Sequence, residues 1–233
     1  MLGGTNKGRF ISFEGGEGVG KSTQVRLLQA QLANLGIAAV QTREPGGSPR
    51  AEAIRRMLLA GSVKQFGQTA EALMFSAARI DHLNNTIRPA LAAGTWVICD
   101  RFADSTRAYQ GALRQIEPQL IDALERVAVG NTRPELTFIL DLAPAEGLRR
   151  AALRAGPDAP FDRFERETLA FHSAVRNIFL DIAAHDPVRC AVIDASLAPE
   201  YVAARIWASV KLRLLGSAGQ QPAGHNAATG SAA

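Results

Sequence analysis

The sequence predicts an α/β fold in which a five-stranded parallel sheet lies between layers of helices. Short apolar runs alternate along the chain with longer amphipathic runs, which is the pattern of parallel strands joined by crossover helices. The 233 residues, 47% of them hydrophobic, fit one large domain with a substantial core. We therefore expect a single domain over residues 9–215, a flexible N-terminus over 1–8 and a disordered tail over 216–233, where no side chain could build a core.

Five short apolar runs are the expected strands, and they cover residues 10–13, 38–42, 96–99, 136–140 and 188–193. The longer runs between them are the expected helices, over residues 21–35, 50–59, 69–93, 117–129, 145–154, 163–184 and 199–215. Pro89 lies inside the third helix and is expected to bend it or end it early. Cys99 and Cys190 each lie in a strand-like run, which fits buried free thiols in a reducing compartment.

A glycine-rich loop stands between the first expected strand and the first expected helix. It reads Gly15-Gly16-Glu17-Gly18-Val19-Gly20-Lys21-Ser22 and has the pattern of a phosphate-binding P-loop. Glycines let backbone N–H groups surround phosphate oxygens, and the helix that opens at Lys21 adds the positive end of its dipole. Lys21 supplies a charge to the β- and γ-phosphates of ATP, and the Ser22 hydroxyl can join the coordination of Mg²⁺, while Thr23 beside it is expected to be structural. The chain is thus predicted to bind a nucleoside polyphosphate on a three-layer P-loop NTPase fold.

Composition excludes several classes of partner. The formal net charge is +4, yet the charges are scattered and form no basic block with interleaved aromatic residues, so nucleic acid is not an expected partner. No apolar stretch approaches the roughly 18 residues that span a bilayer, and the N-terminus lacks a signal pattern. We expect no membrane contact and a cytoplasmic location.

Three further segments fall where a second substrate would bind, at the ends of strands or on a helix that faces them. They cover residues 42–47, 73–79 and 100–111. Phe75 and Arg79 in the second segment share one helix face at spacing i, i+4. Motors, switches and kinases all use P-loops, but the Asn-Lys-x-Asp signature of guanine switches is missing, because Asn6-Lys7 precedes the first strand.

A short lid is expected at about residues 149–163. Residues 155–162 read Ala-Gly-Pro-Asp-Ala-Pro-Phe-Asp and break the helical periodicity between two helices. Arg150 and Arg154 precede them on one helix face at spacing i, i+4, with Arg149 beside them. Such arginines can neutralise charge on a transferring phosphoryl group, an effect worth roughly 10³–10⁵ in rate.

The combination of these motifs resembles the bacterial thymidylate kinases. The shared motifs are Glu-Gly-x-Glu-Gly-x-Gly-Lys-Ser from residue 14, Arg-Glu-Pro-Gly-Gly from residue 43, Asp-Arg-Phe at 100–102 with Ser-Thr-x-Ala-Tyr-Gln-Gly after it, and Asp-Arg-Phe-Glu at 162–165. They occur in the family's order over roughly residues 9–215. The resemblance implies phosphoryl transfer from ATP to dTMP, giving dTDP and ADP, with Mg²⁺ as the metal and a homodimer as the assembly.

The resemblance also implies roles for individual residues. Phe75 would stack on thymine, and Arg79 and Thr106 would hydrogen-bond the edge of the base. Tyr109 would crowd the 2′ position of the sugar, with Gln110 close by, while Arg43 and Arg101 would clamp the acceptor phosphate. The expected dTMP-binding set is completed by Pro45 and Ser105.

Roles at the ATP end follow in the same way. Glu17 would approach the sugar 3′-OH or the metal, and Asp100 would act near Mg²⁺ together with Ser22. The P-loop has Gly18 where a second type of the family has an arginine, so the lid would supply the catalytic cation. Arg154 is the favoured residue, with Arg149, Arg150 and Arg163 as alternatives; Arg150 is also assigned to ATP. The expected catalytic set is Lys21, Arg101, Arg154 and Glu17.

Other functions remain as alternatives. A deoxynucleoside kinase would phosphorylate a neutral hydroxyl and would need a carboxylate base beside it. A kinase of another monophosphate such as dUMP differs by one methyl group, worth only about 1–3 kcal/mol of discrimination. A P-loop switch without enzymatic activity is the third alternative. The segment 194–196 after the last strand is a hypothetical adenine contact.

Overall fold

The fold is known from a computed structural model that describes residues 8–112, 116–155, 164 and 167–216. Its sheet is parallel throughout and has the strand order β2-β3-β1-β4-β5. The strands are β1 (Phe10–Glu14), β2 (Ala39–Arg43), β3 (Trp96–Asp100), β4 (Leu136–Asp141) and β5 (Cys190–Asp194). The expected five-stranded parallel sheet is therefore confirmed, with strand ends that differ from the expectation by one or two residues.

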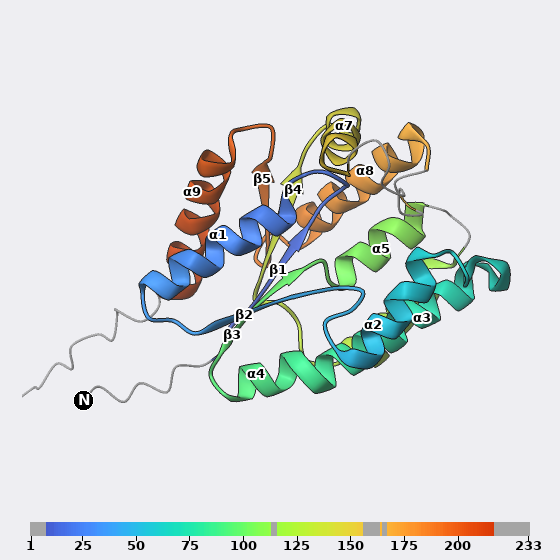
Figure 1. The fold of residues 1–233 in the computed structure, drawn as a ribbon, viewed down its shortest axis with the longest axis horizontal. Helices are drawn as coiled ribbons and strands as arrows, with labels where there is room; N and C mark the ends of the chain where they lie inside the picture. Colours follow the sequence, from blue (N-terminus) through green and yellow to red (C-terminus); the bar gives the residue numbers. More distant parts are fainter. Residues whose placement is uncertain (1–7, 113–115, 156–163, 165–166, 217–233) are drawn as a thin grey trace, which may run out of the picture.

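Helices cover both faces of the sheet and make the third layer of the expected architecture (Figure 1). On one face lie α1 (Lys21–Asn34) and α9 (Pro199–Val210), which pack against each other. Leu28, Leu32 and Ile206 from these helices join Phe13 and Phe138 of the sheet in one buried cluster. This face forms the largest hydrophobic cluster of the described chain, and the buried Gln24 of α1 donates to the Pro199 carbonyl of α9 at 3.0 Å.

The opposite face carries the remaining helices and is the side on which the second-substrate segments lie (Figure 1). These helices are α2 (Pro49–Leu59), α3 (Gly67–His82), α4 (Arg88–Ala92), α5 (Ala103–Ala112), α6 (Pro118–Val129), α7 (Pro144–Ala155) and α8 (Leu169–His185), with a short 3₁₀ turn at Lys64–Phe66. Tyr109 of α5 packs edge-on against Phe171 and Phe179 of α8. The core on this side is thus aromatic and leads directly into the functional region.

Several helices depart from the sequence expectation. The helix α5 was not predicted, because residues 103–112 were interpreted only as a binding segment. The helix expected over 69–93 is instead α3, a π-helical turn at Leu83–Ile87 and α4, so the departure from α geometry comes just before Pro89. The last helix likewise ends in a π-helical turn at Lys211–Leu215.

The helix expected from residue 163 begins only at Leu169. Thr168 ends the preceding extended segment and accepts a hydrogen bond from Phe171 N, which is the usual N-cap arrangement. The expected flap at 155–162 lies outside the described residues, apart from Ala155 at the end of α7, and so does Arg163. Most of the flexible N-terminus and of the tail lies outside them as well, but Gly8 is buried.

One simpler expectation, on the two cysteines, is confirmed. Cys99 and Cys190 are buried and are not joined in a disulfide. Along the stretches that the structure describes, no helix combines the length and the apolar character required to traverse a membrane.

Candidate active site

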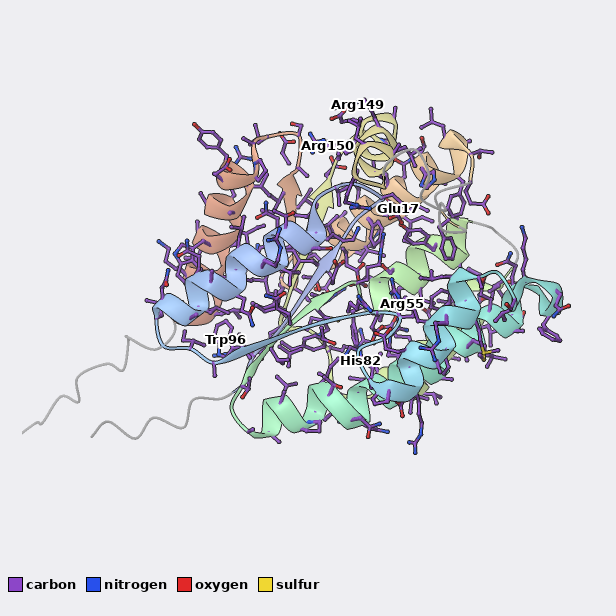
Figure 2. The ribbon with its side chains drawn as sticks, viewed as in Figure 1. Glu17, Arg55, His82, Trp96, Arg149 and Arg150 are labelled. Atoms are coloured by element: carbon purple, nitrogen blue, oxygen red, sulfur yellow. The ribbon has the colours of Figure 1, made fainter. Side chains whose placement is uncertain are left out.

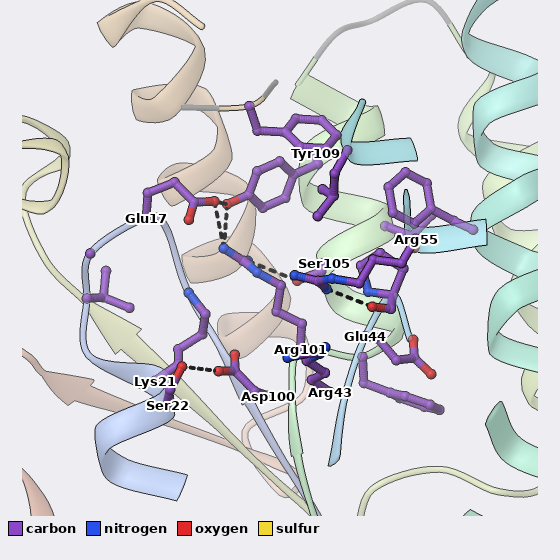
Figure 3. A pocket seen from close by; sticks show the side chains of 18 of the residues that line it. Glu17, Lys21, Ser22, Arg43, Glu44, Arg55, Asp100, Arg101, Ser105 and Tyr109 are labelled. Atoms are coloured by element: carbon purple, nitrogen blue, oxygen red, sulfur yellow. Dashed lines mark hydrogen bonds and ion pairs between the residues drawn. The ribbon is translucent and has the colours of Figure 1, made fainter. Parts of the chain in front are cut away.

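A cleft of about 490 Å³ opens at the carboxyl ends of β1, β2 and β3 (Figure 3). The P-loop forms one wall, and the loop after β2, α3 and α5 form the other. In a parallel sheet this is the edge at which ligands bind, because the strands deliver their following loops to one place. The cleft is lined by Glu17, Gly18, Val19, Gly20, Lys21, Ser22, Thr23, Arg26, Arg43, Glu44, Pro45, Arg55, Leu59, Phe75, Arg79, Asp100, Arg101, Phe102, Ser105, Thr106, Tyr109, Gln110, Arg154 and Phe164.

The P-loop wraps around the side chain of Lys21. Its ammonium group donates to the Gly16 carbonyl at 2.7 Å and to the Gly15 carbonyl at 3.2 Å. Burial and repulsion by Arg101 lower the pKa of Lys21 to about 8, in spite of attraction by Glu17. At neutral pH the group therefore remains mostly protonated, and a phosphate anion in the loop would favour that charged form further.

Gly18 brings the P-loop into backbone contact with α7. A Cβ atom at Gly18, where φ is +66°, would lie only 1.9 Å from the Gly147 carbonyl oxygen. A side chain at this position would meet main-chain atoms that cannot rotate away. A longer side chain has no room at this position, because the backbone of α7 at Gly147 and Ala151 occupies the space.

The Ser22 hydroxyl and the Asp100 carboxylate meet at the floor of the cleft. Ser22 Oγ donates to Asp100 Oδ2 at 2.6 Å, and Asp100 ends β3 directly beside the P-loop strand (Figure 3). A hydroxyl and a carboxylate are oxygen donors of the kind that Mg²⁺ prefers, and this metal commonly takes its other ligands from water and substrate phosphates. Among the described residues there is no cluster of three or more metal-binding side chains, so these two oxygens are the part of the site that fits Mg²⁺.

Arg101 follows Asp100 in a left-handed conformation, with φ at +70°. Its guanidinium donates to Gly15 O at 2.9 Å, to Glu17 Oε1 at 2.7 Å and to the Tyr109 hydroxyl at 2.9 Å (Figure 3). A non-glycine residue in this region costs free energy and persists only where its surroundings hold it. Here the contacts to the P-loop and α5 hold Arg101 between the two walls of the cleft.

Glu17 is the carboxylate that balances this arginine. Besides Arg101, the Tyr109 hydroxyl donates to Glu17 Oε1 at 2.6 Å. Burial alone would raise the pKa of Glu17, but Arg101, Lys21 and the Tyr109 hydroxyl outweigh it and lower the pKa to about 2. Glu17 is therefore a poor proton acceptor at neutral pH and acts as a fixed negative charge.

Glu14, the last residue of β1, fastens α5 to the P-loop strand. It is fully buried, its Oε1 accepts from Phe102 N at 2.7 Å, and its Oε2 lies 2.6 Å from the Ser105 hydroxyl. Burial, together with the nearby charge of Asp104, raises the pKa of Glu14 to about 8 in spite of the Ser105 contact. At neutral pH this carboxyl is largely neutral, which keeps one negative charge out of an anion-binding cleft.

The second wall presents an aromatic ring and a buried arginine. Phe75 of α3 is half-buried and lies near Phe164, with ring centroids 6.4 Å apart. Arg79, one helical turn further on, donates to Glu44 Oε2 at 2.7 Å and to Thr106 Oγ1 at 3.0 Å. Gln110 is buried beside them, and within the described chain its Nε2 has no hydrogen-bond acceptor. This wall thus offers a planar apolar face bordered by donors.

Arg43 reaches the cleft from the end of β2. It is more than half exposed, and its guanidinium donates to both carboxylate oxygens of Glu52 at 3.2 Å. Arg55 of α2 also lines the cleft and donates to the Pro45 carbonyl at 2.7 Å. Together with Arg101 and Lys21 these side chains give the cleft several positive charges, which suits two anionic ligands.

The lid arginines are on α7, above the P-loop (Figure 2). Arg149 and Arg150 both hold Glu146, at 2.7 Å and 2.8 Å, and Arg150 also donates to the Ala195 carbonyl at 3.0 Å. Arg150 therefore connects α7 to the loop after β5. Among the lid arginines that the structure describes, Arg154 is the one that lines the cleft.

Comparisons with known proteins agree with this architecture. The family model for thymidylate kinase matches residues 13–206, which is most of the chain. The chain belongs to the thymidylate kinase family. A thymidylate kinase from Rhodopseudomonas palustris is 57% identical over 90% of this chain and 91% of its own length, and one from Bradyrhizobium sp. is 52% identical over 91% of this chain and 93% of its own.

A solved structure shows the same relation. The thymidylate kinase from Ehrlichia chaffeensis superposes with a TM-score of 0.70 at 32% identity, over 88% of this chain and 99% of that one. The P-loop fold class predicted from the sequence is therefore that of a thymidylate kinase.

Most residues predicted for a thymidylate kinase site line the one cleft. Gly15, Gly16 and Arg150 do not: the two glycines present carbonyls to Lys21, and Arg150 turns toward Ala195. These assignments of individual residues stay predictions.

Sequence reasoning missed four residues that shape this site. Glu14 and Glu44 stood inside the quoted motifs, where an acidic residue next to glycine or proline was a signal that a buried carboxylate anchors a loop. His82 and Arg55 gave no such signal. Both lie on helices at positions where a polar side chain could equally well face solvent. Only the packing of the loop after β2 makes them contact that loop.

Proposed function

We propose that this chain transfers the γ-phosphoryl group of ATP to dTMP, giving dTDP and ADP. The observation that carries the proposal is the position of Arg101 between the two walls of the cleft, where it contacts the P-loop carbonyl Gly15 O and the α5 residue Tyr109. A guanidinium at this position can bind an acceptor phosphate while ATP phosphates occupy the P-loop. The ATP phosphates and the acceptor phosphate would then both lie beside the Arg101 guanidinium.

Catalysis in this arrangement needs positioning more than proton transfer. The second pKa of a phosphate monoester is near 6, so its oxygens are mostly deprotonated at neutral pH and attack without a general base. Lys21 neutralises the β- and γ-phosphates, and Arg101 with Arg43 holds the acceptor phosphate. The chain's cations thereby offset the repulsion between two negatively charged reactants and align them for displacement.

Mg²⁺ is part of the proposal, and Ser22 and Asp100 would hold it. The metal supplies further charge neutralisation to the ATP phosphates when it is bound. The 2.6 Å contact between the Ser22 hydroxyl and the Asp100 carboxylate supports this assignment, because both oxygens are within reach of one ion. Glu17 is less suited to the metal than the sequence suggested, since its carboxylate is engaged by Arg101 and Tyr109.

The acceptor base would bind at the second wall. Phe75 offers its ring for stacking on thymine, while Arg79, Thr106 and Gln110 surround the edge of the base. Tyr109 limits space at the sugar, because its hydroxyl is fixed by Glu17. Pro45 and Ser105 complete the contact surface at the phosphate end.

The lid would close over the ATP phosphates and bring Arg154 to the transferring group. Its place on the cleft wall supports this role over Arg149, which does not line the cleft. Arg150 donates to Ala195 O, which supports a role near the adenine for the loop 194–196. Closure would also exclude water and limit hydrolysis of ATP.

The alternative acceptor, a deoxynucleoside, would need a carboxylate base at the attacking hydroxyl. Glu17 is the carboxylate nearest to Arg101, and with a pKa of about 2 it is too weak a base. No feature of the described cleft therefore favours this second function.

The decisive experiment is an acceptor panel. ADP release is coupled to a spectroscopic assay with thymidine, dTMP, dUMP and dCMP as acceptors, each with ATP and Mg²⁺. We expect dTMP to give the highest kcat/KM. Turnover of thymidine with no turnover of dTMP would refute the assignment of an anionic acceptor, and ADP release that ignores the acceptor would indicate a simple ATPase.

A homodimer and a cytoplasmic location complete the proposal. The outer face of α3 exposes Leu73, Ala77 and Ile80 at spacing i, i+4, i+7, and a second copy of this chain would bury such an apolar stripe. Free buried thiols at Cys99 and Cys190 support a reducing compartment. Light scattering after chromatography should show a dimer that Leu73→Glu converts to a monomer; a monomeric wild type would refute it.

A further inference from the structure

The loop after β2 is fastened to α3 by a chain of buried polar contacts. Glu44 accepts from Arg79 Nε at 2.7 Å through one carboxylate oxygen and from His82 Nδ1 at 3.0 Å through the other. The opposite nitrogen of His82 lies 2.6 Å from Thr42 Oγ1. All three charged or titratable side chains are at least 95% buried, so each contact is shielded from water.

The local sequence makes this close packing possible. A Cβ atom at Gly47, where φ is +83°, would lie 2.3 Å from His82 Nε2 and 2.4 Å from Thr42 Oγ1. Only glycine leaves the space in which the histidine ring meets the loop. An ionised Glu44 can only accept, which places a proton on Nδ1 of His82; in the neutral ring Nε2 then accepts from the Thr42 hydroxyl.

The consequence for Arg79 is a fixed orientation of its guanidinium. Nε is occupied by Glu44, and Nη2 donates to Thr106 Oγ1 at 3.0 Å and to Phe102 O at 3.2 Å. Within the described chain, Nη1 is the one guanidinium nitrogen that has no protein acceptor. Because Arg79 lines the cleft, Nη1 is the nitrogen that a ligand can engage, and it can only donate.

We propose that Glu44 and His82 are positioning residues that set the acceptor specificity by holding Arg79 in this orientation. Nη1 of Arg79, fixed as a donor, can hydrogen-bond a pyrimidine nucleoside monophosphate whose base has a carbonyl oxygen on the facing edge. It cannot hydrogen-bond a base with an amino group there, so that nucleotide is rejected. Released from Glu44, Arg79 could swing aside and admit the amino base with a bridging water. This inference rests on the proposed function, since it concerns the same acceptor site.

The energetics support positioning over a purely structural role. A buried charge pair contributes little net stability relative to apolar residues of similar volume, while loss of one partner is strongly destabilising. A simpler hydrogen bond already fastens the loop to the same helix, because Ser48 Oγ donates to Asp81 Oδ2 at 2.6 Å. The Glu44–Arg79 pair differs from that contact because it alone orients a donor at the cleft.

The test compares acceptor discrimination in matched variants. Glu44→Gln keeps the shape of the side chain but removes the charge, and His82→Asn keeps a donor at the position of Nδ1, whereas His82→Phe removes it. We expect Glu44→Gln and His82→Phe to lower the ratio of kcat/KM for dTMP to that for dCMP about 10-fold, the cost of losing one charge-assisted hydrogen bond. His82→Asn should retain most of the wild-type ratio, and KM for ATP should stay unchanged in all three.

Controls separate positioning from loop anchoring. Asp81→Asn weakens the neighbouring anchor of the same loop without contact to Arg79, so its dTMP-to-dCMP ratio should equal that of the wild type. In the background of Arg79→Ala, Glu44→Gln should have almost no further effect on the ratio, because coupled residues are not additive. Thermal unfolding of each variant confirms that it is folded at the assay temperature.

The outcomes are distinguishable. A wild type that does not phosphorylate dTMP refutes the proposed function before any variant is made. A wild type that does, with equal losses for dTMP and dCMP in Glu44→Gln and His82→Phe, refutes the positioning role. Full additivity of Glu44→Gln with Arg79→Ala would refute it as well.

Discussion

The two walls of the cleft are built in different ways. The P-loop wall comes from consecutive residues between β1 and α1, and it presents backbone groups around Lys21. The opposite wall gathers side chains from the loop after β2, α3 and α5, and it depends on buried ion pairs such as Glu44–Arg79. The comparison teaches that recognition of a phosphate chain can be encoded locally, whereas recognition of a base requires contacts between segments that are far apart in sequence.

The largest expected effect concerns Arg154, which lines the cleft from helix α7. Arg154→Ala removes the lid cation at the transferring phosphoryl group, so kcat should fall by about 10³-fold or more with little change in dTMP affinity. Arg149→Ala is the matched control, because Arg149 is paired with Glu146 on the same helix. Steady-state kinetics of both variants measure the difference. Equal kcat values for the two variants would assign the lid cation to another arginine.

A substitution between the walls should have the next largest effect. Glu17→Gln weakens the hold on Arg101 and Tyr109, and kcat/KM for dTMP should fall by about 10²-fold, as for loss of a preorganised charge contact. KM for ATP should change less, since Lys21 retains its contacts in the P-loop. A larger loss on the ATP side would contradict the assignment of Arg101 to the acceptor.

The same variant should also change how the unfolding free energy depends on pH. The pKa of Glu17 in the folded chain is about 2, against an ordinary value of 4.5, so its stabilising contribution is complete above pH 4.5 and is lost as the pH falls toward 2. Between pH 6 and pH 3 the wild type should lose ~2 kcal/mol more unfolding free energy than Glu17→Gln. Glu146→Gln is the control: its pKa is also about 2, but 32% of its side chain is accessible to solvent, which weakens its pairing.

A substitution at Gly18 tests the P-loop wall alone. Gly18→Ala places a methyl group against the Gly147 carbonyl and should raise KM for ATP by about 30-fold through displacement of the P-loop from α7. Gly61→Ala matches the positive φ, at +75°, in open space, and Gly61 does not line the cleft. It should lose a similar amount of stability to backbone strain and no ATP affinity. A Gly18 variant with normal ATP affinity would mean that this contact is dispensable.

A substitution in the opposite wall alone, where dTMP would bind, should have the smallest of these effects on the kinetics. Phe75→Ala removes the stacking face, and KM for dTMP should rise by about 10-fold, within the range measured for base–aromatic stacking. Phe66→Ala, in an exposed ring on the neighbouring turn, should change nothing. Isothermal titration with each nucleotide separates the two substrates, and an equal loss of ATP and dTMP affinity would indicate a folding defect instead.

Elements with a local pattern were predictable. The strand β1, the P-loop and α1 followed from an apolar run, spaced glycines and an amphipathic helix, all within 26 residues of chain. The helix α5 was missed because Asp104 and Ser105 carry binding-type polar groups and the segment gives no apolar period. It forms because Glu14 binds the first turn through Phe102 N and Ser105, a contact 88 residues apart in sequence.

The sequence by itself determined the class of fold, the phosphate cradle and the family, because each of these depends on residue order over short distances. Only the tertiary structure decided that Gly18 lies against Gly147, that Glu17 is engaged by Arg101 and Tyr109, and that Glu44 and His82 hold Arg79. The physical reason is that a backbone cradle is specified by local conformation. A buried charge acquires its role only from the partners that folding brings to it.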